Sequence, residues 1–178
     1  MKIRHCLFAV VLLFAFTGGA VLAAPSAAAD APRKLRVGIY DSRAISIAYA
    51  SSKYNPVAEK MKELKAAEAA HDTTRVAELK AWGESLQQKL HWQGFGRYPV
   101  DDLLACIQPE LPRIAREADV DVIAATVEFA APGVEVVDIT NRLVEPYHPP
   151  ERAKKWIADL KHVPRVPFET LDKMKADE

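Results

Sequence analysis

Cysteine is nearly absent from this chain, which excludes a fold held together by disulfide bonds. The 178 residues include 2 cysteines, Cys6 and Cys106, and Cys6 lies in an N-terminal segment that we expect to be removed. The remaining thiol then has no partner within the chain, so the hydrophobic core must hold the mature fold. We interpret Cys106 as a small buried hydrophobe on a helix. The alternative interpretation is a reactive thiol.

The chain also lacks an excess of charge of either sign. It has 24 Lys and Arg against 24 Asp and Glu, and loss of an N-terminal segment that carries Lys2 and Arg4 leaves a slight acidic excess. Proteins that bind nucleic acids present a strongly basic face. The composition therefore gives no support to a nucleic-acid partner.

No apolar run in the sequence is long enough to span a membrane. The longest, residues 6–16, falls short of the roughly 20 residues that a transmembrane helix needs. Two basic residues precede it, and Val21 and Ala23 supply the small side chains that a signal peptidase reads. These features predict a cleavable signal peptide over residues 1–23.

Export has consequences for the rest of the chain. We expect residues 24–34, which are rich in alanine and proline, to form a flexible leader. The mature protein is then expected to be soluble and periplasmic, and not an integral membrane protein. The alternative interpretation of the N-terminus is a retained membrane anchor.

Motifs that mark enzymes and metal sites are missing as well. The histidines beyond the signal peptide lack the spacing of a metal-ligand pair, and no phosphate-binding glycine loop or nucleophile elbow is present. Asp101 and Asp102 are adjacent, so on a helix their side chains point about 100° apart. We interpret them as charges at a helix N-terminus rather than as an acid–base pair. The sequence predicts no catalytic residue, no cofactor and no metal.

The chain does contain two helical patterns separated by a polar turn. Asn55 and Pro56 form a strong helix start, and apolar residues then recur at spacings of three and four on both sides of residues 71–74. The apolar residues are Val57, Met61 and Leu64 before the turn, and Val76, Leu79, Gly83, Leu86 and Leu90 after it. We predict an antiparallel helical hairpin that projects from the body as an arm over residues 55–98.

Short β patterns flank this arm. Residues 35–40 alternate in the manner of a half-buried strand, and residues 121–125 predict a second strand. Residues 127–129 and 134–137 lie on either side of the turn signal Ala131-Pro132-Gly133. We therefore expect these two segments to pair as a β-hairpin.

Helices complete the predicted body. Residues 100–118 carry an apolar stripe, and the prolines within it predict a break near Gln108. Residues 141–144 predict a short helix and residues 151–161 a longer one, followed by a tail. The expected fold class is α+β: a small antiparallel β body with a projecting helical hairpin, plus a C-terminal helical extension over residues 151–178.

This order of elements resembles the OmpH/Skp family of periplasmic chaperones. The strand at 35–41 runs into a helical excursion, and the chain returns through residues 118–123, a hairpin and Val137-Asp138-Ile139-Thr140. The resemblance covers residues 33–147 and places a Skp-like domain at 35–150. It implies a β-rich body that trimerises, with arms that together hold unfolded outer-membrane proteins. The arm here is shorter than the family's, with a reach of roughly 22–30 Å, and the chain lacks the family's basic charge.

Large apolar side chains on the arm are the candidate contacts for a client or partner. Three aromatics gather where glycines break the second helix, and rigid aromatic side chains often anchor protein contacts. The predicted contact set is Trp92, Phe95, Tyr98, Met61, Leu79, Leu86 and Leu90. The alternative is that the aromatics pack where the arm rejoins the body and that the two stripes pair only with each other.

These observations lead to a binding protein as the first hypothesis. It is a homotrimeric holdase chaperone, by resemblance, that shields unfolded outer-membrane or envelope polypeptides without a cofactor. The second hypothesis is a non-catalytic envelope scaffold or assembly protein that uses the same oligomeric body. An enzyme is the third, and it has no support from a recognisable constellation of residues.

Overall fold

The computed structural model describes residues 33–173. The predicted signal peptide, nearly all of the predicted leader and residues 174–178 lie outside the described residues. Within the described part no helix is both long and apolar enough to cross a membrane.

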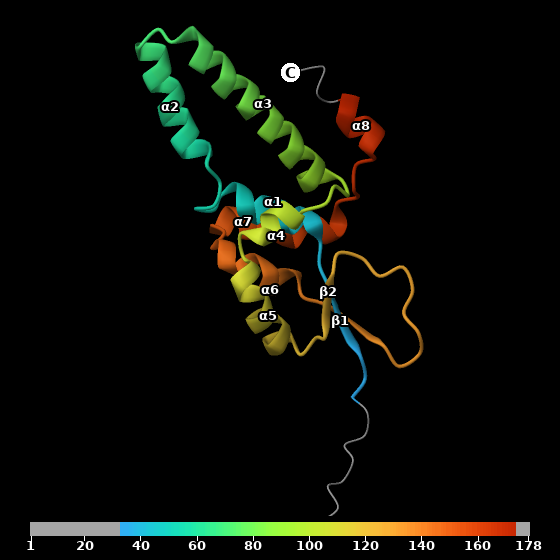
Figure 1. Cartoon of the computed structure of the whole chain (residues 1–178). Coiled ribbons are helices and arrows are strands. Elements are labelled where there is room, and N and C mark those ends of the chain that lie inside the picture. Colours follow the sequence, from blue (N-terminus) through green and yellow to red (C-terminus); the bar gives the residue numbers. More distant parts are fainter. Residues whose placement is uncertain (1–32, 174–178) are drawn as a thin grey trace, which may run out of the picture. The chain divides into compact units, whose positions relative to one another are not determined.

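The sheet has three strands, and all of them are parallel. β1 (Arg36–Ile39) lies in the middle, between β2 (Val122–Ala124) and β3 (Glu135–Asp138) (Figure 1). Val37 is the register partner of both Val122 and Val136. The fold is therefore α+β as predicted, but the prediction of an antiparallel β body is wrong.

The predicted β-hairpin is also wrong, although its turn exists. The amide of Val134 donates to the carbonyl oxygen of Ala131 at 3.0 Å, and Gly133 has a positive φ of 95°. Residues 127–129 form no strand, and the strands before and after the connection, β2 and β3, pair with opposite edges of β1 rather than with each other. Residues 125–134 therefore form a connection that carries the chain from one edge of the sheet to the other.

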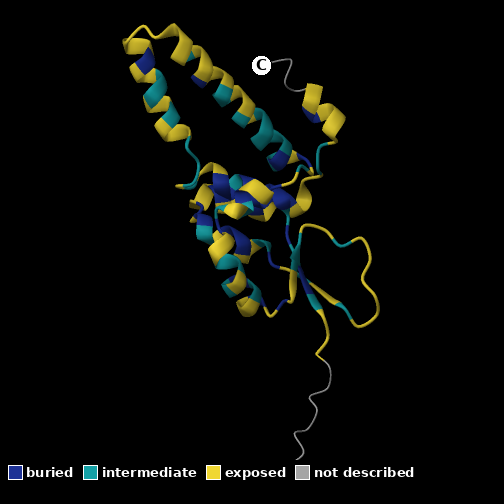
Figure 2. Ribbon diagram, in the orientation of Figure 1, coloured by how far each residue is buried: buried dark blue, intermediate teal, exposed yellow. Residues whose placement is uncertain are grey.

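The hydrophobic core is built around α1 (Ser42–Ala50), which follows β1 directly. The Asp41 carboxylate accepts a hydrogen bond from the Arg43 amide at 3.0 Å and so caps the helix N-terminus. Ala44, Ile45 and Ala48 on this helix have no exposed surface. Figure 2 shows this concentration of buried residues where α1 meets the helices that follow the arm.

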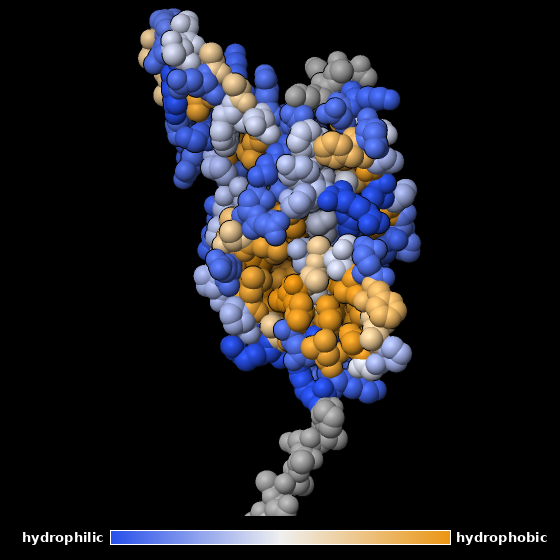
Figure 3. Space-filling view, turned by 45° about the vertical axis from the view of Figure 1, so that its right-hand side comes forward, coloured by the Kyte–Doolittle hydropathy of each residue, from blue (hydrophilic) through white to orange (hydrophobic). Residues whose placement is uncertain are grey.

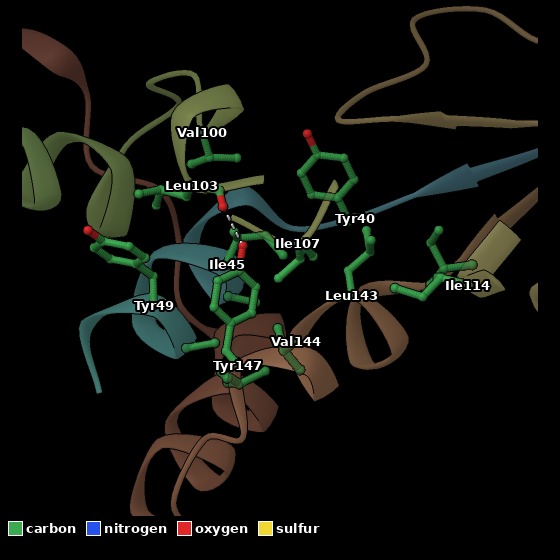
Figure 4. Packing of buried hydrophobic residues seen from close by; sticks show 14 of the residues in the cluster. Tyr40, Ile45, Tyr49, Val100, Leu103, Ile107, Ile114, Leu143, Val144 and Tyr147 are labelled. Atoms are coloured by element: carbon green, nitrogen blue, oxygen red, sulfur yellow. Dashed lines mark hydrogen bonds between the residues drawn. The ribbon is translucent and has the colours of Figure 1, made fainter. Parts of the chain in front are cut away.

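Those helices are short and broken by proline. α4 (Asp101–Ala105) is followed by a 3₁₀ turn, η1 (Gln108–Glu110), and by α5 (Leu111–Ala118), which confirms the predicted break near Gln108. α6 (Thr140–Val144) and a second 3₁₀ turn, η2 (Glu145–Tyr147), follow β3. The Tyr147 hydroxyl donates to the Leu103 carbonyl oxygen at 2.8 Å inside this core (Figure 4).

The arm region contains two helices, α2 (Val57–Ala69) and α3 (Thr73–Phe95). His71 takes a left-handed conformation in the turn between them, and the Asp72 carboxylate caps α3 by accepting from the Arg75 amide at 2.9 Å. Arg75 Nη2 also pairs with Glu63 Oε2 across the two helices at 2.8 Å. The helices lie side by side at this turn and diverge towards α1 (Figure 1).

The C-terminal part packs on the same body. α7 (Glu151–Asp159) contacts α1 and continues into a 3₁₀ turn, η3 (Leu160–His162), and α8 (Phe168–Lys173) contacts α3. The predicted helix over residues 151–161 is present, with its last turn tightened. Residues 163–167 join the two helical segments and pass close to the end of α3, where the Val166 amide donates to the Phe95 carbonyl oxygen at 2.9 Å.

Candidate binding groove

An apolar groove lies between the two diverging arm helices. Its volume is about 1020 Å³, and α1, α2, α3 and residues 156–166 line it. We call it the interhelix groove. Its apolar side chains of larger size are Ile47, Val57, Met61, Leu64, Leu79, Trp82, Leu86, Leu90, Phe95, Trp156, Leu160, Val163 and Val166.

α3 supplies the longest wall of the groove. Leu79, Gly83, Leu86 and Leu90 line it at successive spacings of four, three and four residues, which keeps them on one side of a helix. Gly83 has no neighbouring atom within 4 Å of the place where a Cβ would sit. The wall is therefore flat about one turn from its Leu79 end and leaves the helix backbone open to approach there.

α2 supplies the opposite wall. Val57, Met61 and Leu64 line the groove at the same helical spacing. Val57 is 39% exposed and Met61 is 48% exposed, so packing against α3 does not bury this stripe. Ala67 and Leu79, nearer the turn, are buried at 7% and 6%, so the two helices close on each other only there.

α1 holds the walls apart because it lies across their body end. The Ser46 hydroxyl donates to the Leu90 carbonyl oxygen of α3 at 3.3 Å, and the other end of α1 leads into α2 through residues 51–56. Ile47 and Ala50 then face the groove between these two attachments. The length of α1 thus sets the separation at the base of the groove.

An ion cluster fixes the fourth side of the groove. Asp41 accepts from Arg43 Nη2 at 2.7 Å and from Arg165 Nη2 at 2.9 Å. Arg43 also donates to the carbonyl oxygens of Leu160 and Val163, at 3.0 and 2.7 Å. These bonds hold residues 160–165 beside α1, where they complete the groove wall.

The protonation of Asp41 is tuned by this cluster. Burial alone raises the pKa of the Asp41 carboxyl, but hydrogen bonds from Arg43 and the charge of Arg165 outweigh burial and lower the pKa below its ordinary value. The carboxylate is therefore ionised across the neutral range. Both guanidinium groups are engaged by it, which gives this cluster a structural role in positioning residues 160–165.

The charges at the rim of the groove are few and of both signs. Lys60 is paired with Glu63 at 2.8 Å. Lys80 and Glu84, one turn apart on α3, also line the groove, and within residues 33–173 neither forms an ion pair or a side-chain hydrogen bond. The interior is dominated by apolar side chains. The described part of the chain holds no group of three or more His, Cys, Asp or Glu side chains placed to bind a metal ion.

The structure brings most of the predicted contact residues together. Met61, Leu79, Leu86, Leu90 and Phe95 all line the interhelix groove. They had been predicted from helical spacing and from the aromatic cluster. The spacing did not indicate that the two stripes would face a shared open space rather than close on each other.

Trp92 and Tyr98 lie elsewhere. The Trp92 ring packs 5.3 Å from the Tyr98 ring and 5.2 Å from the Phe168 ring, measured between centroids. These contacts correspond to the packing alternative, in which the aromatics join the arm to the body. They also attach α8 to the end of α3.

Two tryptophans in the groove were missed from the sequence. Trp82 lies three residues after Leu79 and four before Leu86, so helical spacing alone could have indicated it. Trp156, which is 48% exposed, lies on α7, and no local pattern connects it with α3. Its place in the groove depends on the docking of α7 against α1.

A second apolar surface lies on the sheet. Leu35, Val122 and Val136 are 49%, 46% and 40% exposed, and Phe129 in the connection 125–134 is 80% exposed. In Figure 3 apolar surface gathers on the lower part of the molecule, below the two arm helices. We call these four residues the sheet patch. Parallel sheets normally have both faces covered, so the sheet patch marks an incompletely covered surface.

Comparison of the chain with protein-family models, curated proteins and solved structures found no match in any of the three.

Proposed function

We propose that this chain is an exported polypeptide-binding protein that holds apolar segments of other proteins in the interhelix groove. The observation that carries the proposal is the groove itself: about 1020 Å³ of open space between helices whose apolar stripes remain partly exposed. Unfilled apolar surface of this kind is costly in water and marks interaction sites. The proposal assigns the chain no catalytic reaction and no cofactor.

The groove suits a polypeptide segment better than a small metabolite. Its α3 wall runs from Leu79 to Phe95, a rise of about 24 Å at 1.5 Å per residue. Pockets for small ligands are typically about 300–1,000 Å³ and combine an apolar lining with a few convergent polar groups. Here Arg43 and Ser46 at the α1 base are already hydrogen-bonded within the chain, and tryptophan, leucine and methionine, which suit adaptable protein contacts, form most of the walls.

The compartment and client class follow from the sequence. The predicted signal peptide supports export to the periplasm, and the resemblance to the OmpH/Skp family supports a holdase for unfolded outer-membrane or envelope polypeptides. The neutral net charge favours contacts that are apolar and distributed over selection by charge.

The sheet patch supports an oligomeric body. A second copy that covers Val122 and Val136 would bury the face of the parallel sheet that the single chain leaves open. A homotrimer is the state that the family resemblance implies. The same patch also favours the alternative function, a non-catalytic envelope scaffold in which the sheet patch binds one defined partner.

The proposal is tested by aggregation of an unfolded outer-membrane protein diluted from urea in the presence of the mature chain. We expect the wild type to suppress light scattering, and Met61→Glu to lose most of the effect because it places a carboxylate on the α2 wall. Ala58→Glu is the matched control, since it adds the same charge to an exposed position of α2 that does not line the groove.

The outcomes separate the two candidate functions. Equal suppression by Met61→Glu and Ala58→Glu would show that the groove is not the binding site. No suppression by the wild type at several-fold molar excess, together with recovery of one envelope protein in a pull-down, would replace the holdase with the scaffold.

A further inference from the structure

We propose that the interhelix groove receives its occupant as an amphipathic α-helix rather than as an extended strand. This inference rests on the proposed function and specifies the conformation in which a bound segment is held. It concerns the α2 and α3 walls, the α1 base and the two rim charges on α3.

A segment bound in the groove needs hydrogen-bond partners for its backbone N–H and C=O groups. The walls are helices, so their backbone groups are already paired within each helix. An extended segment in the groove would bring its own N–H and C=O groups into an apolar space that offers them few partners, which is strongly unfavourable. A helical segment satisfies these groups internally and presents only side chains to the walls.

The dimensions of the groove agree with a helix. The α3 wall between Leu79 and Phe95 offers about 24 Å, enough for a helix of about 16 residues. Such a helix would contact the walls through residues at i, i+3, i+4 and i+7, the usual pattern for a helix that binds in a groove. Trp82 and Trp156, both groove-lining, supply the large anchors that such contacts use.

Gly83 marks the point of closest approach. Glycine is disfavoured inside a helix, and a Cβ at this position would meet nothing within 4 Å. Packing within the single chain therefore gives no reason for the absence of a side chain at this point of the groove wall. Close approach of a second helix does give one, because a small residue allows two helix backbones to come near each other.

The rim charges indicate the chemistry that flanks the apolar stripe of the occupant. Lys80 and Glu84 lie one turn apart beside Gly83 and are free of ion pairs within the described residues. A partner helix along α3 complements them when it carries an acidic and a basic residue one turn apart. The expected occupant is therefore an amphipathic helix whose leucine-rich stripe is bordered by charges of both signs.

Two peptides of about 18 residues and identical composition test the inference. Both contain Leu, Ala, Glu and Lys without tryptophan; one places leucine at helical spacing and the other at alternating positions. Fluorescence of Trp82 and Trp156 reports binding, and circular dichroism reports peptide helicity. We expect the helical peptide to bind at least tenfold more tightly and to gain helicity when it binds.

Gly83 provides the matched variants. Gly83→Leu extends a side chain into the groove from a position with free space, so the fold is preserved while affinity for the helical peptide falls at least tenfold. Gly83→Ala, which adds a single methyl group, is expected to retain more of the affinity. The double variant Lys80→Glu/Glu84→Lys is expected to weaken binding by about twofold to fivefold, with recovery when the Glu and Lys positions of the peptide are exchanged.

The outcomes distinguish this inference from the function on which it rests. Equal or tighter binding of the alternating peptide, lost in Met61→Glu, would overturn the helical occupant but keep the groove as the binding site. Binding of neither peptide, together with no suppression of aggregation, would overturn both. Unchanged binding by a folded Gly83→Leu would place the occupant outside the interhelix groove.

Discussion

Packing within the chain requires a glycine at one position and does not require one at another. At Gly38 in β1 a Cβ would lie 2.7 Å from Ile139 Cδ1 and 3.2 Å from Val120 Cγ2. The core therefore needs the absence of a side chain there, because Ile139, just before α6, and Val120, between α5 and β2, pack directly against the strand. At Gly83 no contact within the single chain requires the absence of a side chain. This residue therefore indicates a binding surface.

This contrast gives a prediction for stability. We expect Gly83→Ala to raise the free energy of unfolding by roughly 0.5–1 kcal/mol, since alanine favours the helix and meets no neighbour. Gly38→Ala should lower it by about 1–3 kcal/mol through overpacking against Ile139 and Val120. Urea unfolding followed by circular dichroism measures both. A loss of stability in Gly83→Ala would mean that the space beside α3 is occupied in the folded chain.

At the scale of elements, local patterns predicted the helices better than the sheet. The spacing of Val57, Met61 and Leu64 is a property of one segment, so it could be recognised without the rest of the fold. Strand pairing is not local: Val122 and Val136 both align with Val37, and nothing in either short segment indicates that its partner is β1. The turn signal Ala131-Pro132-Gly133 therefore suggested a hairpin of residues 127–129 with 134–137, which the sheet does not contain.

The candidate site could likewise be predicted only where local patterns determine it. Residues on the α2 and α3 stripes could be identified from spacing, but the opening between them depends on α1 at the base and on the Ser46 contact with Leu90. Trp156 was unpredictable because its place depends on contacts between α7 and α1. A binding groove built from several elements is visible in sequence only as separate stripes.

The ion cluster at Asp41 makes the stability of the fold depend on pH. Asp41 links α1 to residues 160–165 through Arg43 and Arg165, and its pKa is lowered below the ordinary value of about 3.9. The folded chain therefore binds fewer protons at this site than the unfolded chain. The stabilisation is present above about pH 4 and is lost as the pH falls through the folded pKa.

Substitution of this residue should remove both effects. We expect Asp41→Asn to cost about 1.5–3 kcal/mol at pH 7 and to flatten the fall in stability below about pH 4. Urea unfolding at a series of pH values is the measurement, with Glu128→Gln, an exposed position in the connection 125–134, as the control. An acid limb as steep in Asp41→Asn as in the wild type would assign the pH dependence to other carboxyl groups.

At the scale of the whole molecule, the two apolar surfaces lie on different elements and serve different purposes in the proposal. The interhelix groove is concave and suits a bound segment. The sheet patch lies over β2, β3 and the connection 125–134 and suits another copy of the chain. Because the surfaces share no residue, each can be altered without the other.

Oligomeric state is the property that separates these roles. We expect the mature chain to sediment as an oligomer at micromolar concentration, and Val136→Lys to shift it towards the monomer, because a lysine at this 40% exposed position is tolerated in water but not in an apolar contact. Circular dichroism of the variant should be unchanged, since the side chain is not part of the core. Val163→Lys, at a 50% exposed position of the groove, is the matched control and should leave the oligomer intact.

If instead the wild type sediments as a monomer, the sheet patch must be the site of a different partner. The scaffold would then account for the exposed sheet better than a self-assembled holdase.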